Sequence, residues 1–305
     1  MKIIIKILSA AALFVLGAAP VNAETAAVYE PQYKYVKLDT AIKAAYVTIG
    51  ETTNPPVVLI HGFTDSYLSF AQVAPLIADA GYFVIIPDLR GHGASDKPKK
   101  GYYSVAEHTA DINNLLDKLK IKKALIAGHS LGSFIGQNLA VKNPDKVSAI
   151  TLIGSAATVE GNETLAWLLN GDGETFEGIN NAKELPEAFL KDWTLSTNYD
   201  PAFVSKTLEN AKKLPLYAWV NAANGISGNP ENLSKIKVPA QIIWGTKDAF
   251  FSLKDQLELI EKLGSDKILF IKKEGASHNT HWDEQLYKDI SKDIVSFIKS
   301  NSYAK

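Results

Sequence analysis

The chain has 305 residues, enough to bury a sizeable core, and its simplest interpretation is one large α/β domain with an insertion. Its formal net charge of −1 at pH 7 supplies no basic field for nucleic acid or an anionic membrane. The absence of cysteine excludes disulfides, a lipid-modified cysteine anchor and cysteine-based metal sites.

The first 23 residues have the pattern of a secretory signal peptide. Two early lysines precede an apolar stretch over residues 7–19, and the small-residue run Val21-Asn22-Ala23 predicts cleavage after Ala23. Because the stretch is short and is interrupted by Pro20, a transmembrane helix is disfavoured, although an uncleaved anchor remains the alternative. The mature protein is therefore expected to be periplasmic or secreted.

Alternating strand and helix patterns follow this leader. Two short runs at residues 33–38 and 45–49 predict an antiparallel pair at a sheet edge. The next runs predict a strand, a helix, a strand and a helix in that order, at residues 57–60, 67–80, 82–86 and about 105–119. The two predicted strands are continuously apolar, as expected of strands buried on both faces.

A G-x-S-x-G motif lies at residues 128–132, between an apolar run and a helical pattern. In such a motif the serine sits on a tight strand-to-helix turn, and the two glycines let the strand and the helix approach closely. The turn exposes the hydroxyl of Ser130 and directs the first helical N–H groups, beginning with that of Leu131, toward the space above it. The pattern therefore predicts a nucleophilic serine, although serines near glycines also make ordinary turns.

The alternating pattern stops after a predicted strand at residues 147–153. The next segment is helical, polar and aromatic, and strands resume at 240–244 and 267–271. Alternating units predict a mostly parallel sheet, and the interruption predicts a helical cap over its carboxyl edge. The predicted division is a core of residues 24–154 and 238–305, with a cap (lid) of residues 155–237.

Function in a parallel α/β sheet is expected in the loops that follow the carboxyl ends of the strands. The loop after Trp244 offers the carboxylate of Asp248, and the loop after Ile271 offers the imidazoles of His278 and His281. A hydroxyl, a carboxylate and an imidazole therefore follow one another in the chain, in the order serine, aspartate, histidine.

This order resembles that of serine hydrolases of the α/β-hydrolase fold superfamily. Five ordered passages carry the resemblance, namely H-G-F at 61–63, D-L-R-G-H-G-x-S at 88–95, the motif at 128–132, W-G-x-x-D at 244–248 and G-x-x-H at 275–278. The resemblance implies Ser130 as nucleophile, His278 as base and Asp248 as the acid that orients it. It also implies the backbone N–H groups of Phe63 and Leu131 as an oxyanion hole, a helical cap, and neither a cofactor nor a metal.

Each assignment has a simpler rival. Asp248 could be a helix N-terminal acid or a surface turn carboxylate, and His281 competes with His278 as the base. Other polar residues near the motifs are expected to have structural roles: His61 and His129 as spacers or hydrogen-bonding groups, His92 and Arg90 in loop packing or an ion pair, and His108 on a helix surface. Aromatic side chains of the cap are expected to be mainly core, with some lining an acyl pocket.

The expected function is hydrolysis of a carboxylic ester with a small to medium apolar acyl group, through an acyl-enzyme intermediate. A serine at the turn argues against the dehalogenase and epoxide-hydrolase branches of the superfamily, which use a carboxylate nucleophile there. A lactonase or a carbon–carbon bond hydrolase with the same three residues remains an alternative, as does a ligand-binding protein without turnover. The expected partner is a small-molecule substrate, and the sequence leaves monomer and dimer open.

Overall fold

A computed structural model describes residues 32–301 except 102, 175, 184–197 and 227–231. The predicted signal peptide lies outside the described residues, as do two aromatic residues of the predicted cap, Phe189 and Trp193. None of the described helices is both long and apolar enough to cross a membrane.

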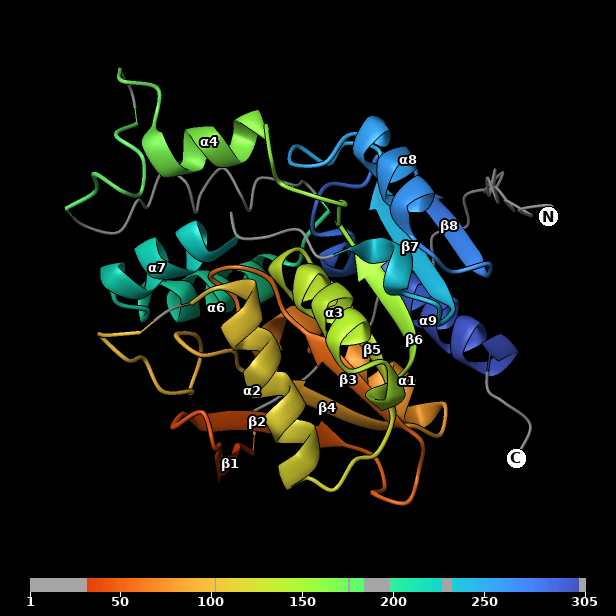
Figure 1. The fold of residues 1–305 in the computed structure, drawn as a ribbon. Coiled ribbons are helices and arrows are strands. Elements are labelled where there is room, and N and C mark those ends of the chain that lie inside the picture. Colours follow the sequence, from red (N-terminus) through yellow and green to blue (C-terminus); the bar gives the residue numbers. More distant parts are fainter. Residues whose placement is uncertain (1–31, 102, 175, 184–197, 227–231, 302–305) are drawn as a thin grey trace, which may run out of the picture.

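The centre of the fold is one eight-stranded sheet with the strand order β1-β2-β4-β3-β5-β6-β7-β8 (Figure 1). The strands are β1 Lys34–Lys37, β2 Lys43–Ile49, β3 Pro56–Ile60, β4 Phe83–Pro87, β5 Ala124–His129, β6 Val147–Ile153, β7 Ala240–Gly245 and β8 Ile268–Lys273. Only the β1–β2 and β2–β4 pairs are antiparallel. The predicted α/β fold, its antiparallel edge and its parallel body are therefore confirmed.

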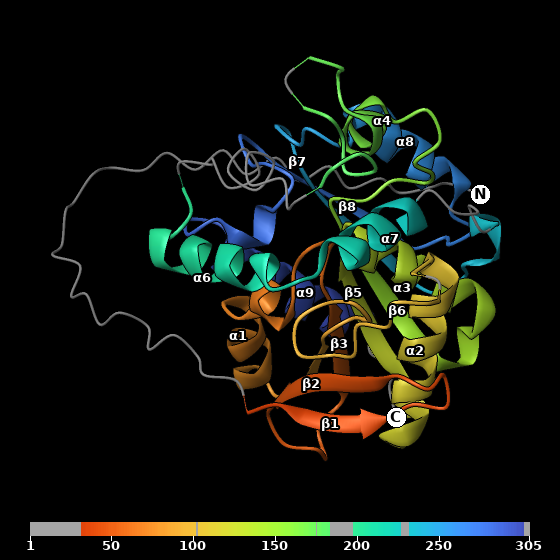
Figure 2. The same cartoon turned by 90° about the vertical axis from the view of Figure 1, so that its left-hand side faces the viewer.

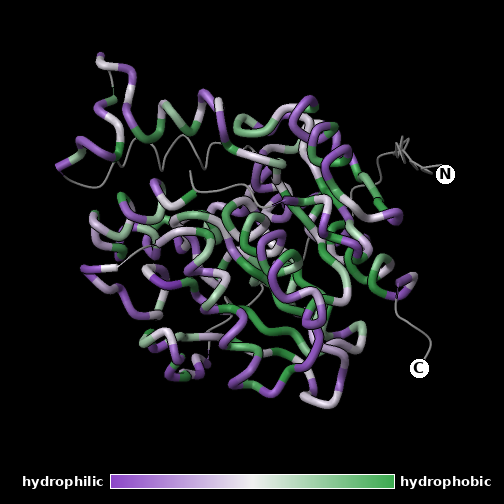
Figure 3. The backbone as a smooth tube through the Cα atoms, viewed as in Figure 1, coloured by the Kyte–Doolittle hydropathy of each residue, from purple (hydrophilic) through white to green (hydrophobic). Residues whose placement is uncertain are grey.

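Helices cover both faces of the sheet (Figures 1 and 2). The longer helices of the two layers are α1 Val73–Asp79, α2 Val105–Lys118, α3 Leu131–Lys142, α8 Leu253–Lys262 and α9 Tyr287–Asn301, with short 3₁₀ turns η1 Tyr67–Phe70, η2 Pro144–Lys146 and η4 Thr280–Trp282. Val58 and Ile60 of β3 belong to the apolar cluster that contains residues of α2 and α3, whereas Val57 and Leu59 pack with α1 and α9. This alternation explains why the central strands are hydrophobic along their length, which appears as green in the middle of the molecule in Figure 3.

The single helix predicted over residues 67–80 is two pieces, η1 and α1. Pro75 explains the break, because its ring would clash with the carbonyl of Ala71 if one helix ran through both segments. Proline is tolerated in the first turn of α1 instead, where its missing N–H costs no helical hydrogen bond.

The helices between β6 and β7 lie together at one side of the molecule (Figure 1). They are α4 Glu163–Asn170, α6 Pro201–Lys212 and α7 Leu216–Ile226, followed by η3 Leu233–Lys235. The described part of this segment has no strand beyond an isolated bridge between Tyr199 and Asp283. The cap boundaries at residues 155 and 237 stay predictions.

Candidate active site

The turn between β5 and α3 has the strained geometry that the motif predicts. Ser130 has φ 50° and ψ −117°, and its N–H donates to the backbone oxygen of Ile153 at 3.0 Å. A Cβ atom at Gly128 would lie 2.1 Å from the oxygen of Gly132, and one at Gly132 would lie 2.1 Å from the oxygen of Ile60. Only glycine fits at either position, so strand and helix meet closely enough to form the turn.

The hydroxyl of Ser130 makes no capping hydrogen bond to α3, which begins directly after it. The side-chain oxygen of a serine at this position usually accepts a hydrogen bond from one of the first backbone N–H groups of the helix. The positive φ removes the hydroxyl from that role, and Ser130 lines a pocket instead. The first two N–H groups of α3, those of Leu131 and Gly132, thus lie at the positive end of the helix dipole beside the serine, without a side-chain cap from it.

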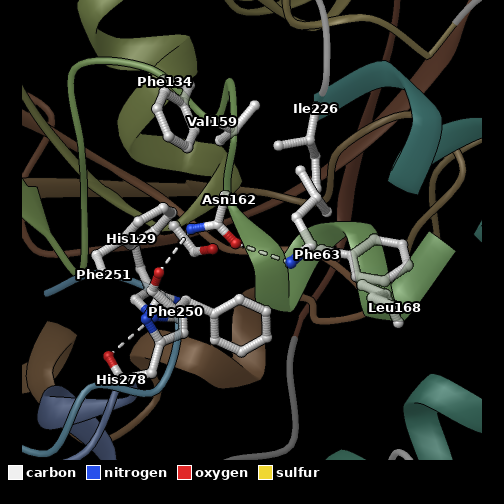
Figure 4. Close-up of a pocket in the computed structure, with 12 residues that line it drawn as sticks. Phe63, His129, Phe134, Val159, Asn162, Leu168, Ile226, Phe250, Phe251 and His278 are labelled. Atoms are coloured by element: carbon white, nitrogen blue, oxygen red, sulfur yellow. Dashed lines mark hydrogen bonds between the residues drawn. The ribbon is translucent and has the colours of Figure 1, made fainter. Parts of the chain in front are cut away.

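Ser130 and His278 both line one pocket, to which α4 and α7 also contribute side chains. Figure 4 shows His278 beside Phe250 in this pocket. The cavity is small, with a volume of about 40 Å³. The described lining residues include His129 and Asn162 and are otherwise apolar: Phe63, Phe134, Val159, Leu165, Leu168, Ile226, Phe250 and Phe251. None of these lining residues is lysine, arginine, aspartate or glutamate.

Asp248 and His278 form a hydrogen-bonded pair at the carboxyl ends of β7 and β8. Nδ1 of His278 lies 2.9 Å from Oδ2 and 3.0 Å from Oδ1 of Asp248, whose side chain is fully buried. Oδ1 also accepts hydrogen bonds from the N–H groups of Phe250 and Phe251, at 2.8 and 3.0 Å. Because Nδ1 faces the carboxylate, it carries the proton, and Nε2 is the nitrogen left to accept one.

His281 lies on a different side of the loop and does not reach Asp248. Its Nε2 lies 2.9 Å from Oγ of Ser69, its ring stacks on Phe70, and it is completely buried. Burial, together with the nearby His278, lowers the pKa of His281 to about 3. The structure therefore pairs His278, and not its rival, with the acid.

The loop that carries Phe63 lies directly against the serine. A Cβ atom added to Gly62 would come within 3.3 Å of the Cβ of Ser130, and Phe63 itself lines the pocket. Leu131 is the first residue of α3, so its N–H lies in the part of the helix that has no internal acceptor. Both predicted oxyanion residues are thus next to Ser130.

Arg90 and His92 support these loops from within the protein. Arg90 donates from Nε and Nη2 to Asp111 at 2.6 and 2.7 Å, which makes the expected ion pair a buried, bidentate one. The ring nitrogen Nδ1 of His92 lies 2.9 Å from the oxygen of Arg90. His61 bonds through both ring nitrogens, to the oxygen of Gly62 at 2.7 Å and to the N–H of Leu89 at 3.0 Å.

The prediction that His108 lies on a helix surface is wrong, because its side chain is completely buried. It occupies the same face of α2 as Val105, Ile112 and Leu115, which pack into the core. The spacing of three, four and three residues between these positions is the sequence signal that places it inside. Burial lowers the pKa of His108 well below its usual range, so it is neutral.

Several pocket residues were not expected from the sequence. Within the described lining, the cap contributes Asn162 and aliphatic side chains and none of the expected aromatic ones, whereas Phe250 and Phe251 come from the core. The ring of Phe250 lies 4.8 Å from that of His278 and the ring of Phe251 lies 5.6 Å from it, so both cover the imidazole. The only sequence signal for the two phenylalanines is their place in the loop that carries Asp248, shortly after the end of β7. Within the described ranges, no group of three or more histidine, cysteine, aspartate or glutamate side chains could hold a metal ion.

Comparison with known proteins identifies the family. The model of the alpha/beta hydrolase fold matches residues 55–285, and the chain belongs to this family. Lipase 1 of Psychrobacter immobilis is 28% identical over 243 residues, which are 76% of this chain and 74% of the lipase. Epoxide hydrolase A of Mycobacterium tuberculosis is 34% identical over 117 residues, but the match spans only 38% of this chain and 36% of that protein.

The fold is shared with a solved enol-lactonase from Burkholderia xenovorans LB400, with a TM-score of 0.72 and 21% identity. The alignment covers 87% of this chain and 100% of the lactonase. At this identity the likeness shows the fold alone. The family, with its lipase and epoxide hydrolase relatives, supports a hydrolase activity for this chain.

Proposed function

We propose that the protein is a serine hydrolase that cleaves carboxylic esters with a short, uncharged, apolar acyl group. The observation that carries the proposal is the meeting of Ser130 and the Asp248–His278 pair at an apolar pocket. A hydroxyl with a buried carboxylate–imidazole pair beside it is the arrangement that activates serine for acyl transfer.

The proposed reaction has two halves. His278 takes the hydroxyl proton at Nε2 as Ser130 attacks the ester carbonyl, and Asp248 stabilises the imidazolium that forms. The N–H groups of Phe63 and Leu131 donate to the oxyanion of the tetrahedral intermediate. His278 then returns the proton to the departing alcohol, which leaves an acyl-enzyme. Water, deprotonated by His278, attacks the acyl carbonyl, and the carboxylic acid departs as Ser130 regains its proton.

The charge of the pocket favours esters over the alternatives. Substrates that carry a carboxylate, as many lactones and ring-cleavage products do, need a lysine or arginine partner when they are buried. The described lining offers neither, and the only arginine of the chain is bound to Asp111. The small open volume favours short acyl groups such as acetyl and butyryl.

The test is a panel of p-nitrophenyl esters from acetate to laurate, with Ser130→Ala as the inactive control. We expect the highest kcat/KM for short chains and a loss of roughly a thousandfold or more in Ser130→Ala. Mono-p-nitrophenyl succinate is the matched charged probe for the butyrate ester, and we expect it to be a much poorer substrate.

Other outcomes of this panel separate the rival functions. A preference for lactones, or for the succinate ester, would contradict the uncharged-ester proposal and support a lactonase. If the wild type hydrolyses none of the acyl substrates and a fluorophosphonate does not label Ser130, a ligand-binding protein without turnover becomes the better explanation.

We also propose that residues 1–23 direct export and that the protein works in the periplasm or outside the cell. The support is the pattern of the leader described above. Mass spectrometry of protein expressed with its leader tests this, because we expect the mature chain to begin at Glu24.

A further inference from the structure

Asn162 joins the cap to the loop that holds the proposed acid. It lies just before α4, and its side-chain oxygen accepts a hydrogen bond from the N–H of Leu165 at 2.8 Å, which caps the helix. Its side-chain nitrogen donates to the backbone oxygen of Phe250 at 2.7 Å (Figure 4). One amide group therefore both starts α4 and holds the loop that follows Asp248.

A second contact reinforces the first. Oγ1 of Thr164 donates to the backbone oxygen of Ala249 at 2.9 Å, so the first turn of α4 binds two consecutive carbonyl groups. The same short loop directs the N–H groups of Phe250 and Phe251 toward Oδ1 of Asp248. The loop is thus held on one side by the carboxylate and on the other by the cap.

We propose that Asn162 and Thr164 are positioning residues that make the geometry of the Asp248–His278 pair depend on the seating of α4. The inference rests on the proposed function. When α4 is seated, the carbonyl groups are bound and the loop presents its N–H groups to the carboxylate. When α4 moves away, these carbonyl groups lose their partners, and the carboxylate is held less firmly toward the imidazole.

The acyl pocket lets a bound substrate influence the position of α4. α4 also supplies Leu165 and Leu168 to the lining, so an acyl group that fills the pocket packs against the helix and holds it in place. Filling the pocket therefore favours the arrangement of the acid and the base that catalysis requires. A substrate too small to touch α4 forgoes this assistance.

The experiment compares substitutions that remove one contact and keep the rest. Asn162→Ser retains a capping oxygen for α4 but is too short to reach Phe250. Thr164→Val removes the other donor with little change of shape, and Thr164→Ser restores the hydroxyl. Asn232→Ser is the matched control, because Asn232 caps η3 through its side-chain oxygen and lies outside the pocket lining.

We expect Asn162→Ser and Thr164→Val each to lower kcat about 3- to 10-fold, the effect of one neutral hydrogen bond. The loss of kcat should be larger with p-nitrophenyl acetate than with the butyrate, because an acetyl group is too small to contact α4 and cannot help to hold the helix in place. KM should change little, because neither substitution alters the apolar side chains that line the pocket. Thr164→Ser and Asn232→Ser should match the wild type in all three measurements.

The kcat of folded enzyme, measured well below the unfolding temperature, separates positioning from folding. A role confined to folding would lower the unfolding temperature or raise KM and leave this kcat unchanged with both esters, and that result would overturn the inference.

Failure of the proposed function looks different. If the wild type has no esterase activity, or if Ser130→Ala keeps it, the proposed chemistry is wrong. If the wild type is active and depends on Ser130, but both variants keep the wild-type kcat with both esters, the coupling alone is wrong.

Discussion

Two groups of three histidines lie inside the protein, and their difference shows what makes a buried polar cluster a candidate site. The first, which we call the site group, has ring centroids 4.5 and 4.8 Å apart and consists of His129, His278 and His281. The second, the support group, has centroids 5.2 and 6.2 Å apart and consists of His61, His92 and His108. All six side chains are buried.

Burial and histidine content are the same in the two groups, but the hydrogen-bond partners differ. In the site group, Nδ1 of His278 faces a buried carboxylate, and its ring lines a cavity together with a serine. In the support group, His61 and His92 bond to backbone groups, and the nearby carboxylate of Asp111 is taken by Arg90. A buried imidazole becomes a candidate base only when one nitrogen has an acid and the other faces open space.

The largest effect expected from this comparison is on activity. His278→Ala should lower kcat roughly a thousandfold or more, because it removes the group that accepts the proton from Ser130. His281→Ala should keep at least about a tenth of the wild-type kcat and should instead lower the unfolding temperature, because it leaves a cavity between Ser69 and Phe70. Steady-state kinetics of both variants measure kcat, and thermal melts measure the unfolding temperature.

The reverse result, loss of turnover in His281→Ala with activity retained in His278→Ala, would contradict the assignment of the base. His108→Ala in the support group serves as a further control. It should behave like His281→Ala, since its ring is buried and His108 is not among the described residues that line the pocket of Ser130.

The next largest effect should appear in stability. Arg90→Met leaves the carboxylate of Asp111 buried without its cation, and we expect a loss of about 3 to 5 kcal/mol in the free energy of unfolding. The specific activity of the molecules that remain folded should change little, because the ion pair does not line the pocket. Urea unfolding at pH 7 measures the effect.

Lys118→Met is the matched control for that substitution. Lys118 also pairs with an aspartate, Asp39, but both side chains are exposed to solvent. Surface pairs contribute little to stability, so the control should unfold close to the wild type. Equal losses of unfolding free energy in the two variants would show that the buried pair of Arg90 and Asp111 stabilises the protein no more than the exposed pair does.

The sequence predicted the fold well because strand burial and the turn at Ser130 leave strong local patterns. The apolar strand at 147–153 was placed at its observed bounds, and the glycines at 128 and 132 marked the turn. The order of Ser130, Asp248 and His278 also depends only on which strand each loop follows. Parallel topology then brings the three loops to one edge.

What the sequence could not show depends on contacts between distant segments. His108 looked like a surface residue because its helix was read without the sheet against which it packs. The choice between His278 and His281 depends on which way a short loop turns, and their spacing of three residues does not fix that. The sequence does not indicate a role for Asn162, because its hydrogen bond to Phe250 forms only when α4 packs against the loop after Asp248.

A more gradual effect, spread over a range of pH, concerns a carboxyl group in the loop that also carries His61. Asp65 is buried, and burial raises its pKa to about 7, with nearby Asp88 adding to the shift and hydrogen bonds from Ser69 and Ser66 opposing it. The folded protein therefore keeps a proton on Asp65 that the unfolded chain, with an ordinary aspartate pKa near 4, gives up.

Stability should consequently fall as pH rises between about 4 and 7, because the unfolded state binds fewer protons there. Below about pH 4 both states are protonated, and above pH 7 both are ionised, so the contribution of Asp65 is constant outside this window. Its slope is at most about 1.4 kcal/mol per pH unit. Asp65→Asn cannot ionise, so urea unfolding of this variant from pH 4 to 8 should lack that part of the wild-type decline. Parallel curves for the two proteins would mean that Asp65 is already ionised in the folded state at low pH, in which case burial is compensated by its hydrogen bonds.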